Sequence, residues 1–210
     1  MATASQSLFN MTVAADSSSN NQGLLMPKLQ YRFRALFLNF GTGGATTELT
    51  KQVMDITRPQ LQFDEVTLDI YNSRVYLAGK HQWQETTINL RDDAQGNVTK
   101  LVGQQIQKQM DFVEQASAAT AQDYKFQINY EVLDGGNGTL TPNVLETWEI
   151  YGCFIKTANY NNMDYKTSDP ATIQLAIRFD NAIQSPLTAG VGTNVGRAFG
   201  GASVTGIGGR

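Results

Sequence analysis

The sequence predicts a mainly β protein, an antiparallel β-barrel or sandwich with one long amphipathic α-helix and extended termini. Two patterns predict this class. Polar and apolar residues alternate in seven short segments, which is typical of strands with one buried face. Between the fourth and fifth of these segments, apolar residues recur at intervals of three and four, which indicates a helix. A regular strand–helix–strand rhythm is missing, so we do not expect a parallel sheet.

The first half of the chain contains four of the expected strands. The segment 31–37 alternates aromatic and mostly polar side chains, and the segments 62–70 and 74–78 alternate on either side of a short turn. We expect the last two to pair as a hairpin, with 84–90 as the fourth strand. The region 45–57 fits a loop or a short helix.

A helix is expected from Val98 to Gln115, about 18 residues or five turns. Its start is marked by Asp92, Asp93 and Asn97, whose oxygens suit helix capping. One stripe of the helix is apolar and consists of Val98, Leu101, Val102, Ile106, Met110 and Val113. The opposite, polar face consists of Gln104, Gln107, Lys108 and Asp111.

Three further strands are expected in the second half, at 124–132, 145–157 and 172–179. The middle one is partly apolar on both faces, so it should be a central strand. A glycine-rich turn at 134–138 and an exposed Asn/Asp/Tyr loop at 159–170 separate the three.

The two ends differ from the middle in composition. Residues 1–29 are rich in Ser, Asn and Ala, and residues 181–210 are dominated near their end by Gly, Ala, Val and Thr. Such segments cannot build a core of their own. We therefore expect a β domain at 30–180 with an extension on each side. The first segment lacks the features of a signal peptide, and no apolar run has the length of a membrane span.

Charge and composition disfavour several classes of site. The net charge is −3 and no run of Lys and Arg is present, so tight nucleic-acid binding is not expected. Cys153 is the single cysteine and His81 the single histidine, which disfavours a disulfide and a zinc site.

No catalytic arrangement stands out. Asp64 and Glu65 point to opposite faces of an expected strand, and the pair Asp92 and Asp93 is explained by the helix start. A Gly-x-Ser-x-Gly motif is missing, and the glycine-rich segment 41–44 lacks the lysine of a phosphate loop. We expect no catalytic, cofactor-binding or metal-binding residues, and hence no enzyme.

Several motifs occur in a particular order in the middle of the chain. The segment 57–66 reads TRPQLQFDEV and 72–79 reads NSRVYLAG. Trp83 is followed by LRDD at 90–93, and WEIYGCFI occupies 148–155. Together these motifs resemble the tail tube proteins of contractile-tailed bacteriophages, over about residues 30–180. The resemblance implies a fold shared with the tube proteins of type VI secretion.

The resemblance also implies a function. Proteins of this family form six-membered rings that stack into a hollow tube, which a sheath drives through the host envelope and through which DNA passes. Implied partners are other copies of the chain, the sheath, the tape measure protein in the lumen, the baseplate and the tail terminator. DNA would pass without specific binding, no membrane anchor is implied, and the protein would be assembled in the host cytoplasm and end in the virion tail.

Two sets of residues are hypotheses for surfaces of such a tube. Strict alternation opposite apolar residues makes a set of polar side chains candidates for the lumen: Glu65, Thr67, Asp69, Gln127, Asn129 and Glu131. Simple solvent exposure explains that alternation equally well. The wet side of the helix is a candidate sheath contact, formed by Gln104, Lys108 and Asp111. The loop 41–57 and both ends are expected to contact other subunits.

Other readings remain open from the sequence. A tube-like baseplate or tail-completion protein would have the same fold. A protein of another class, a lectin-like β-sandwich, would use the polar loop containing Tyr160, Asn161, Asn162 and Tyr165.

Overall fold

A computed structural model describes residues 27–42, 46–136, 142–186, 190–193, 197–199 and 202–204. The chain divides into two compact units, Met1–Arg32 and Phe33–Arg210. In the first unit the described part is a turn, in which the N–H of Arg32 donates to the carbonyl of Leu29. Most of the expected N-terminal extension, part of the expected C-terminal extension and part of the turn 134–138 lie outside the described residues.

The second unit is built mainly from antiparallel strands. Its elements are β1 (Phe33–Leu38), α1 (Thr47–Lys51), β2 (Val53–Ile56), β3 (Leu61–Ile70), β4 (Ser73–Trp83), β5 (Thr86–Arg91), α2 (Asn97–Gln109), β6 (Met110–Asp111), β7 (Ala116–Ser117), α3 (Ala121–Tyr124), β8 (Phe126–Leu133), β9 (Val144–Tyr160), β10 (Thr172–Arg178), β11 (Asn181–Pro186), β12 (Arg197–Phe199) and β13 (Ala202–Val204). The prediction of a mainly β, antiparallel fold is therefore confirmed.

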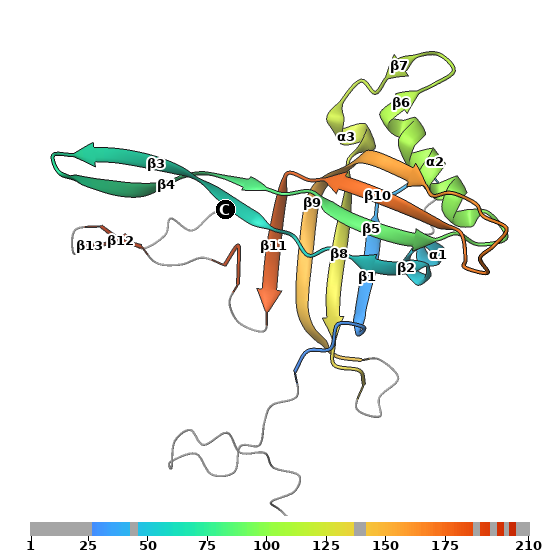
Figure 1. The fold of residues 1–210 in the computed structure, drawn as a ribbon, viewed down its shortest axis with the longest axis horizontal. Helices are drawn as coiled ribbons and strands as arrows, with labels where there is room; N and C mark the ends of the chain where they lie inside the picture. The colour runs from blue at the N-terminus through green and yellow to red at the C-terminus, as the bar shows by residue number, and fades with distance from the viewer. Residues whose placement is uncertain are drawn as a thin grey trace, which may run out of the picture. The chain divides into compact units, whose positions relative to one another are not determined.

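Strand β9 joins two groups of strands. Its first part pairs with β8 on one side and β11 on the other, and β1 pairs with β8. Its last part pairs with β10, which is followed by β5 and β2. Figure 1 shows β1, β8, β9 and β11 side by side, crossed by β10, β5 and β2. Among the described residues no pairing joins β1 to β2, so the closed barrel that the sequence allowed is not found.

The core lies between these two groups. Alternate residues of β8 are buried, and they face buried aliphatic residues of β5 and β10. Burying one such large apolar side chain contributes about 1.5–3 kcal/mol, so these rows account for much of the stability. The buried apolar residues of the three strands are Phe126, Ile128, Tyr130, Val132, Ile88, Leu90, Ile173, Leu175 and Ile177.

Helix α2 closes one end of the core with Val98, Leu101 and Val102. Gln105 is also fully buried on this helix. It accepts a hydrogen bond from the N–H of Gly41 at 2.9 Å and donates one to the carbonyl of Tyr124 at 2.6 Å. One side chain thus connects α2 to the segments on both of its flanks.

The helix begins as expected but ends early. Asp93 Oδ1 accepts the N–H of Val98 in the first turn, as a capping oxygen does. The last residue is Gln109, so the expected helix to Gln115 is wrong by nearly two turns. Asp111 Oδ1 accepts the N–H groups of Val113 and Glu114 and thereby stabilises a tight turn instead.

Two regions have more structure than was expected. The region 45–57 includes α1 and the strand β2, which pairs with β5. The segment after Asp180 contributes β11, which pairs with β9 from Asn181 to Pro186. Gly152 lies in β9 with a φ of +67°, close to the point where β9 passes from the first group of strands to the second.

Candidate functional site

The β3–β4 hairpin is the most exposed regular structure in the described chain. All ten residues of β3 are exposed, and β4 is exposed except at Gly79 and Trp83. Within the described residues, the two strands pair only with each other. Figure 1 shows the hairpin extending away from the other strands.

The strand register gives the hairpin two chemically different faces. Residues directly opposite each other in an antiparallel pair share a face. Val66 is opposite Leu77 and Leu68 is opposite Val75, with Ile70 at the end of the same row. We call these five residues the aliphatic face; each is between 40% and 55% exposed.

The other face of the hairpin is polar and internally bonded. It carries Glu65, Thr67 and Asp69, three of the residues expected in a lumen. Asp69 forms an ion pair with Arg74 at 2.8 Å, and Thr67 donates to Glu65. Since exposed ion pairs contribute little, these contacts do not explain how the long hairpin is stabilised.

Gly79 allows a close approach of the two strands near the middle of the hairpin. A Cβ at this position would lie 3.0 Å from the carbonyl oxygen of Asp64. The register shifts at the same place, between Phe63 and Glu65. An isolated two-stranded hairpin is only marginally stable in water, and no other strand of the described chain pairs with this one.

The group formed by β1, β8, β9 and β11 has β1 and β11 as its edge strands. β1 pairs only with β8, and β11 pairs only with β9, within the described residues. The outer side of β1 therefore presents backbone donors and acceptors to which a further strand could bond. The outer side of β11 is partly occupied, because the N–H of Gln184 donates to the carbonyl of Val191 at 2.8 Å.

The outward face of this group contains the other three residues that were expected in a lumen. Gln127, Asn129 and Glu131 lie on one face of β8 and are partly buried. Gln127 donates to Asn129 at 2.8 Å, and Glu131 pairs with Arg34 at 2.5 Å. The six expected lumen residues thus lie on two separate surfaces, three on the hairpin and three on β8.

The three residues expected to meet a sheath have different surroundings. Gln104 accepts the N–H of Thr42 and Lys108 donates to the carbonyl of Asn39, both at 3.4 Å. Asp111 lies beyond the helix, in β6. Two of the three therefore contact the chain's own loop after β1.

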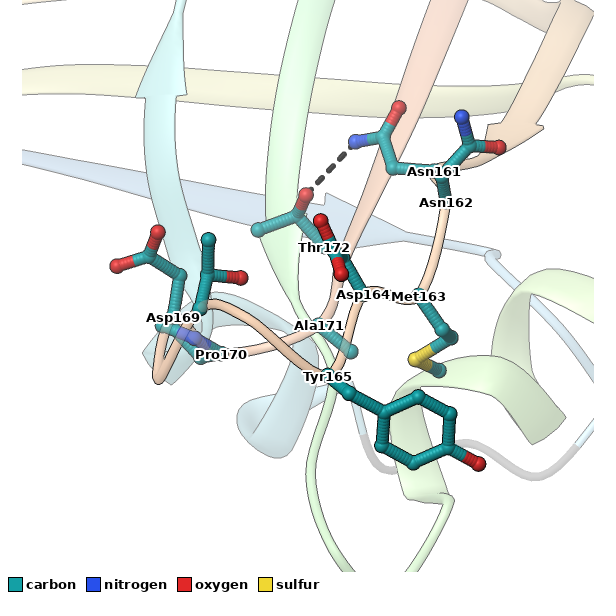
Figure 2. A pocket seen from close by; sticks show the side chains of 10 residues that line it. Asn161, Asn162, Met163, Asp164, Tyr165, Asp169, Pro170, Ala171 and Thr172 are labelled. Atoms are coloured by element: carbon teal, nitrogen blue, oxygen red, sulfur yellow. Dashed lines mark hydrogen bonds between the residues drawn. The ribbon is translucent and has the colours of Figure 1, made fainter.

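The loop between β9 and β10 forms a hollow whose lining includes Asn161, Asp164, Asp169 and Thr172. Asn161 donates to Thr172 at 2.7 Å. Figure 2 shows Met163 and Tyr165 pointing to one side of the loop and Asp169 to the other. The hollow contains three of the four residues of the lectin-like hypothesis, Asn161, Asn162 and Tyr165.

The cysteine and the possible metal-binding side chains were also compared with the requirements of a reactive site. Cys153 is fully buried, and burial raises the pKa of its thiol to about 12. No group of three or more His, Cys, Asp or Glu side chains suited to a metal ion occurs among the residues described. In the same part of the chain, no helix is long and apolar enough to cross a membrane.

Comparison with known proteins gives a likeness of fold. No family model matches the chain, and no curated protein sequence matches it. A structure of the anti-feeding prophage cap, the tube-terminating cap, matches with a TM-score of 0.59 and 13% identity, over 82% of this chain and 99% of that one. The sheath/tube terminator of an extracellular contractile injection system, PVC, matches with a TM-score of 0.53 and 18% identity, over 78% and 99%.

A third structure, the sheath–tube complex of the same PVC system, contains a chain that matches with a TM-score of 0.52 and 16% identity, over 78% of this chain and 95% of that one. At these identities the likeness concerns the fold alone. The resemblance to tail tube proteins is confirmed at that level.

Proposed function

We propose that this protein is the repeating structural subunit of the inner tube of a contractile, phage-like tail. The observation that carries the proposal is the aliphatic face of the β3–β4 hairpin, where five large side chains project into solvent on a hairpin that pairs with no other strand of the described chain. Exposed apolar surface of this kind is typical of protein–protein contacts. The fold is shared with a tube-terminating cap and with a chain of a sheath–tube complex, which supports a contact within such an assembly.

The open edge of β1 supports a contact between copies. It lies at one end of a four-stranded group, so an extended strand of the next copy can pair with it. A contact between two different surfaces of the same protein closes into a ring or continues as a filament. We infer hexameric rings that stack into a hollow tube.

The outward face of β8 fits the lumen of such a tube. Arg34 is neutralised by Glu131, and Gln127 and Asn129 are bonded to each other, so the surface offers no unpaired cation at these positions. Because phosphate binding depends on Lys and Arg, such a wall would let DNA slide past rather than retain it. The proposal includes DNA conduction and a tape measure protein in the lumen. It also includes contacts with sheath, baseplate and terminator, and a place in the virion tail.

A capping or baseplate role is the second candidate. It is favoured by the likeness to a tube-terminating cap and to a sheath/tube terminator. Such a protein would form one ring without stacking further.

Electron microscopy of the purified full-length chain, with native mass spectrometry, tests the proposal. Hollow tubes built of rings, with six copies in the smallest closed species, are expected for a tube subunit. Single rings that do not stack would favour the cap. Monomers at every concentration would overturn both.

A further inference from the structure

A groove runs between α2 and the last part of β9. Its lining includes Ile106, Phe112, Ala158 and Tyr160, and it is open to solvent. Phe112 is 57% exposed and Tyr160 51% exposed, which leaves much of two aromatic rings uncovered. The groove is therefore a largely apolar surface, with Gln107 and Lys156 also in its lining.

One edge of β9 borders the groove and is open. β8 leaves β9 at Cys153, opposite Phe126, while β10 continues along the other side of β9 as far as Tyr160. From Phe154 onward, no strand of the described residues pairs with the side of β9 that β8 has left. An open strand edge beside an apolar groove is a place where an extended segment can add to a sheet.

Gln109 shows that this edge accepts the hydrogen bonds of a peptide unit. The N–H of Ile155 donates to Gln109 Oε1, and Gln109 Nε2 donates to the carbonyl of Ile155, both at 2.9 Å. A side-chain amide has the same donor and acceptor as a backbone amide. The Gln109 amide bonds to the backbone of Ile155 on this edge. The Gln109 amide does not bond to the backbone of the following stretch, Lys156 to Tyr160.

We propose that the β3–β4 hairpin of a second copy of this chain binds along this edge, with its aliphatic face on the groove. No strand of the described part of the chain occupies either outer edge of the hairpin, so either strand can bond to β9. The aliphatic segment of β3 runs from Val66 to Ile70, and it matches in length the stretch from Lys156 to Tyr160. Ile106, Phe112 and Tyr160 would cover the aliphatic side chains that are exposed in one copy.

The positions of the two surfaces require a second copy. In Figure 1 the hairpin extends away from the strands on the side opposite α2, so it cannot reach the groove beside α2 of its own chain. A head-to-tail contact results, which builds rings or filaments. The inference rests on the proposed function because it names the partner surface for the hairpin in such an assembly.

Site-specific disulfide formation tests this contact. One variant carries Leu68→Cys or Val75→Cys on the aliphatic face, and it is mixed before assembly with a second variant that carries Ala158→Cys in the groove. Cys153 is buried in both, so it does not compete. Mild oxidation of the assembled protein should give disulfide-linked dimers from these mixtures. Mixtures with Thr147→Cys, on the first part of β9, in place of Ala158→Cys should give none.

A pair of neighbouring substitutions provides the second measurement. Phe112→Asp should weaken self-association by at least about tenfold, since a buried aromatic ring in a contact is commonly worth that much. Val113→Asp is the matched control, because Val113 is 89% exposed and is not part of the groove lining. Circular dichroism of both variants should equal that of the parent protein.

The outcomes separate this inference from the proposed function. Assembled rings or tubes without disulfides at the groove, or with full assembly of Phe112→Asp, would overturn the inference and leave the proposed function standing. Absence of any assembly in the parent protein would overturn both. Disulfides at position 158 together with weakened assembly of Phe112→Asp are the expected result.

Discussion

Gly152 and Asp180 approach each other so closely that a Cβ on Gly152 would lie 2.2 Å from Oδ2 of Asp180. Gly152 has a φ of +67°, a conformation that other residues adopt at a cost. Asp180 is fixed there by an N–H donated to the carbonyl of Tyr151 at 3.0 Å and by an ion pair with Lys125 at 2.5 Å. The turn from β10 into β11 is thereby attached to the bend of β9.

Gly152→Ala should therefore lower the free energy of unfolding by about 2 kcal/mol or more, through backbone strain and the contact with Asp180. Urea unfolding followed by circular dichroism measures this. Gly103→Ala is the control, because a Cβ at Gly103, within α2, would meet no atom within 4 Å. That change should raise stability by up to about 1 kcal/mol. Equal stability of the two variants would contradict the role of Gly152.

Strand periodicity predicted the strands well because alternation within one segment reports which of its side chains are buried. The alternation from Phe126 to Val132 predicts buried and outward residues, and the structure has that pattern throughout β8. The two apolar faces at 145–157 predict a central strand, and β9 pairs on both sides along its first part. What the pattern could not give is closure, since pairing between distant edges such as β1 and β2 depends on the whole topology.

The end of helix α2 and the covered face of the hairpin were harder to predict from the sequence, for different reasons. The apolar spacing continues through Met110 and Val113, but one carboxylate, Asp111, binds two backbone N–H groups and favours a turn. For the hairpin, alternation separates Val66 and Leu68 from the polar face correctly. It does not say which face a partner would cover, because that would depend on the contact proposed above.

Gln105 gives a prediction for the packing of α2. Gln105→Leu keeps the volume but leaves the N–H of Gly41 and the carbonyl of Tyr124 without their partner in a buried site. Each loss costs about 1–3 kcal/mol, so we expect a clear decrease in the free energy of unfolding. Gln107→Leu, on the exposed side of the same helix, should stay within about 0.5 kcal/mol of the parent protein. Thermal and urea unfolding of both variants measure the difference, and equal midpoints would contradict the role given to Gln105.

Asp93 gives a prediction for pH. Its pKa is lowered from 3.8, first by the N–H donated from Val98 and also by the side chain of Asn97. A lowered pKa in the folded state means that the unfolded chain binds a proton first as the pH falls. This contribution to stability is complete above the unfolded pKa near 3.8 and is lost as the pH falls through the lower folded value.

Unfolding free energies of the parent protein should therefore decrease as the pH falls from 5 toward 2, and the decrease should be smaller in Asp93→Ala. Chemical unfolding at several pH values, at constant ionic strength, measures both curves. Parallel curves would show that the hydrogen bond to Val98 does not depend on the charge of Asp93.

The aliphatic face gives the prediction most directly tied to function. Leu68→Lys places a charge in the middle of this face, where a covering subunit would have to bury it, so ring or tube formation should be lost. The variant should still fold, since Leu68 is 44% exposed and makes no part of the buried core. Thr67→Lys is the matched control on the neighbouring residue, which points to the polar face, and it should assemble like the parent. Light scattering after size-exclusion chromatography gives the assembly state, and circular dichroism checks the fold. Normal assembly of Leu68→Lys, or equal loss in both variants, would show that the aliphatic face is not what holds the subunits together.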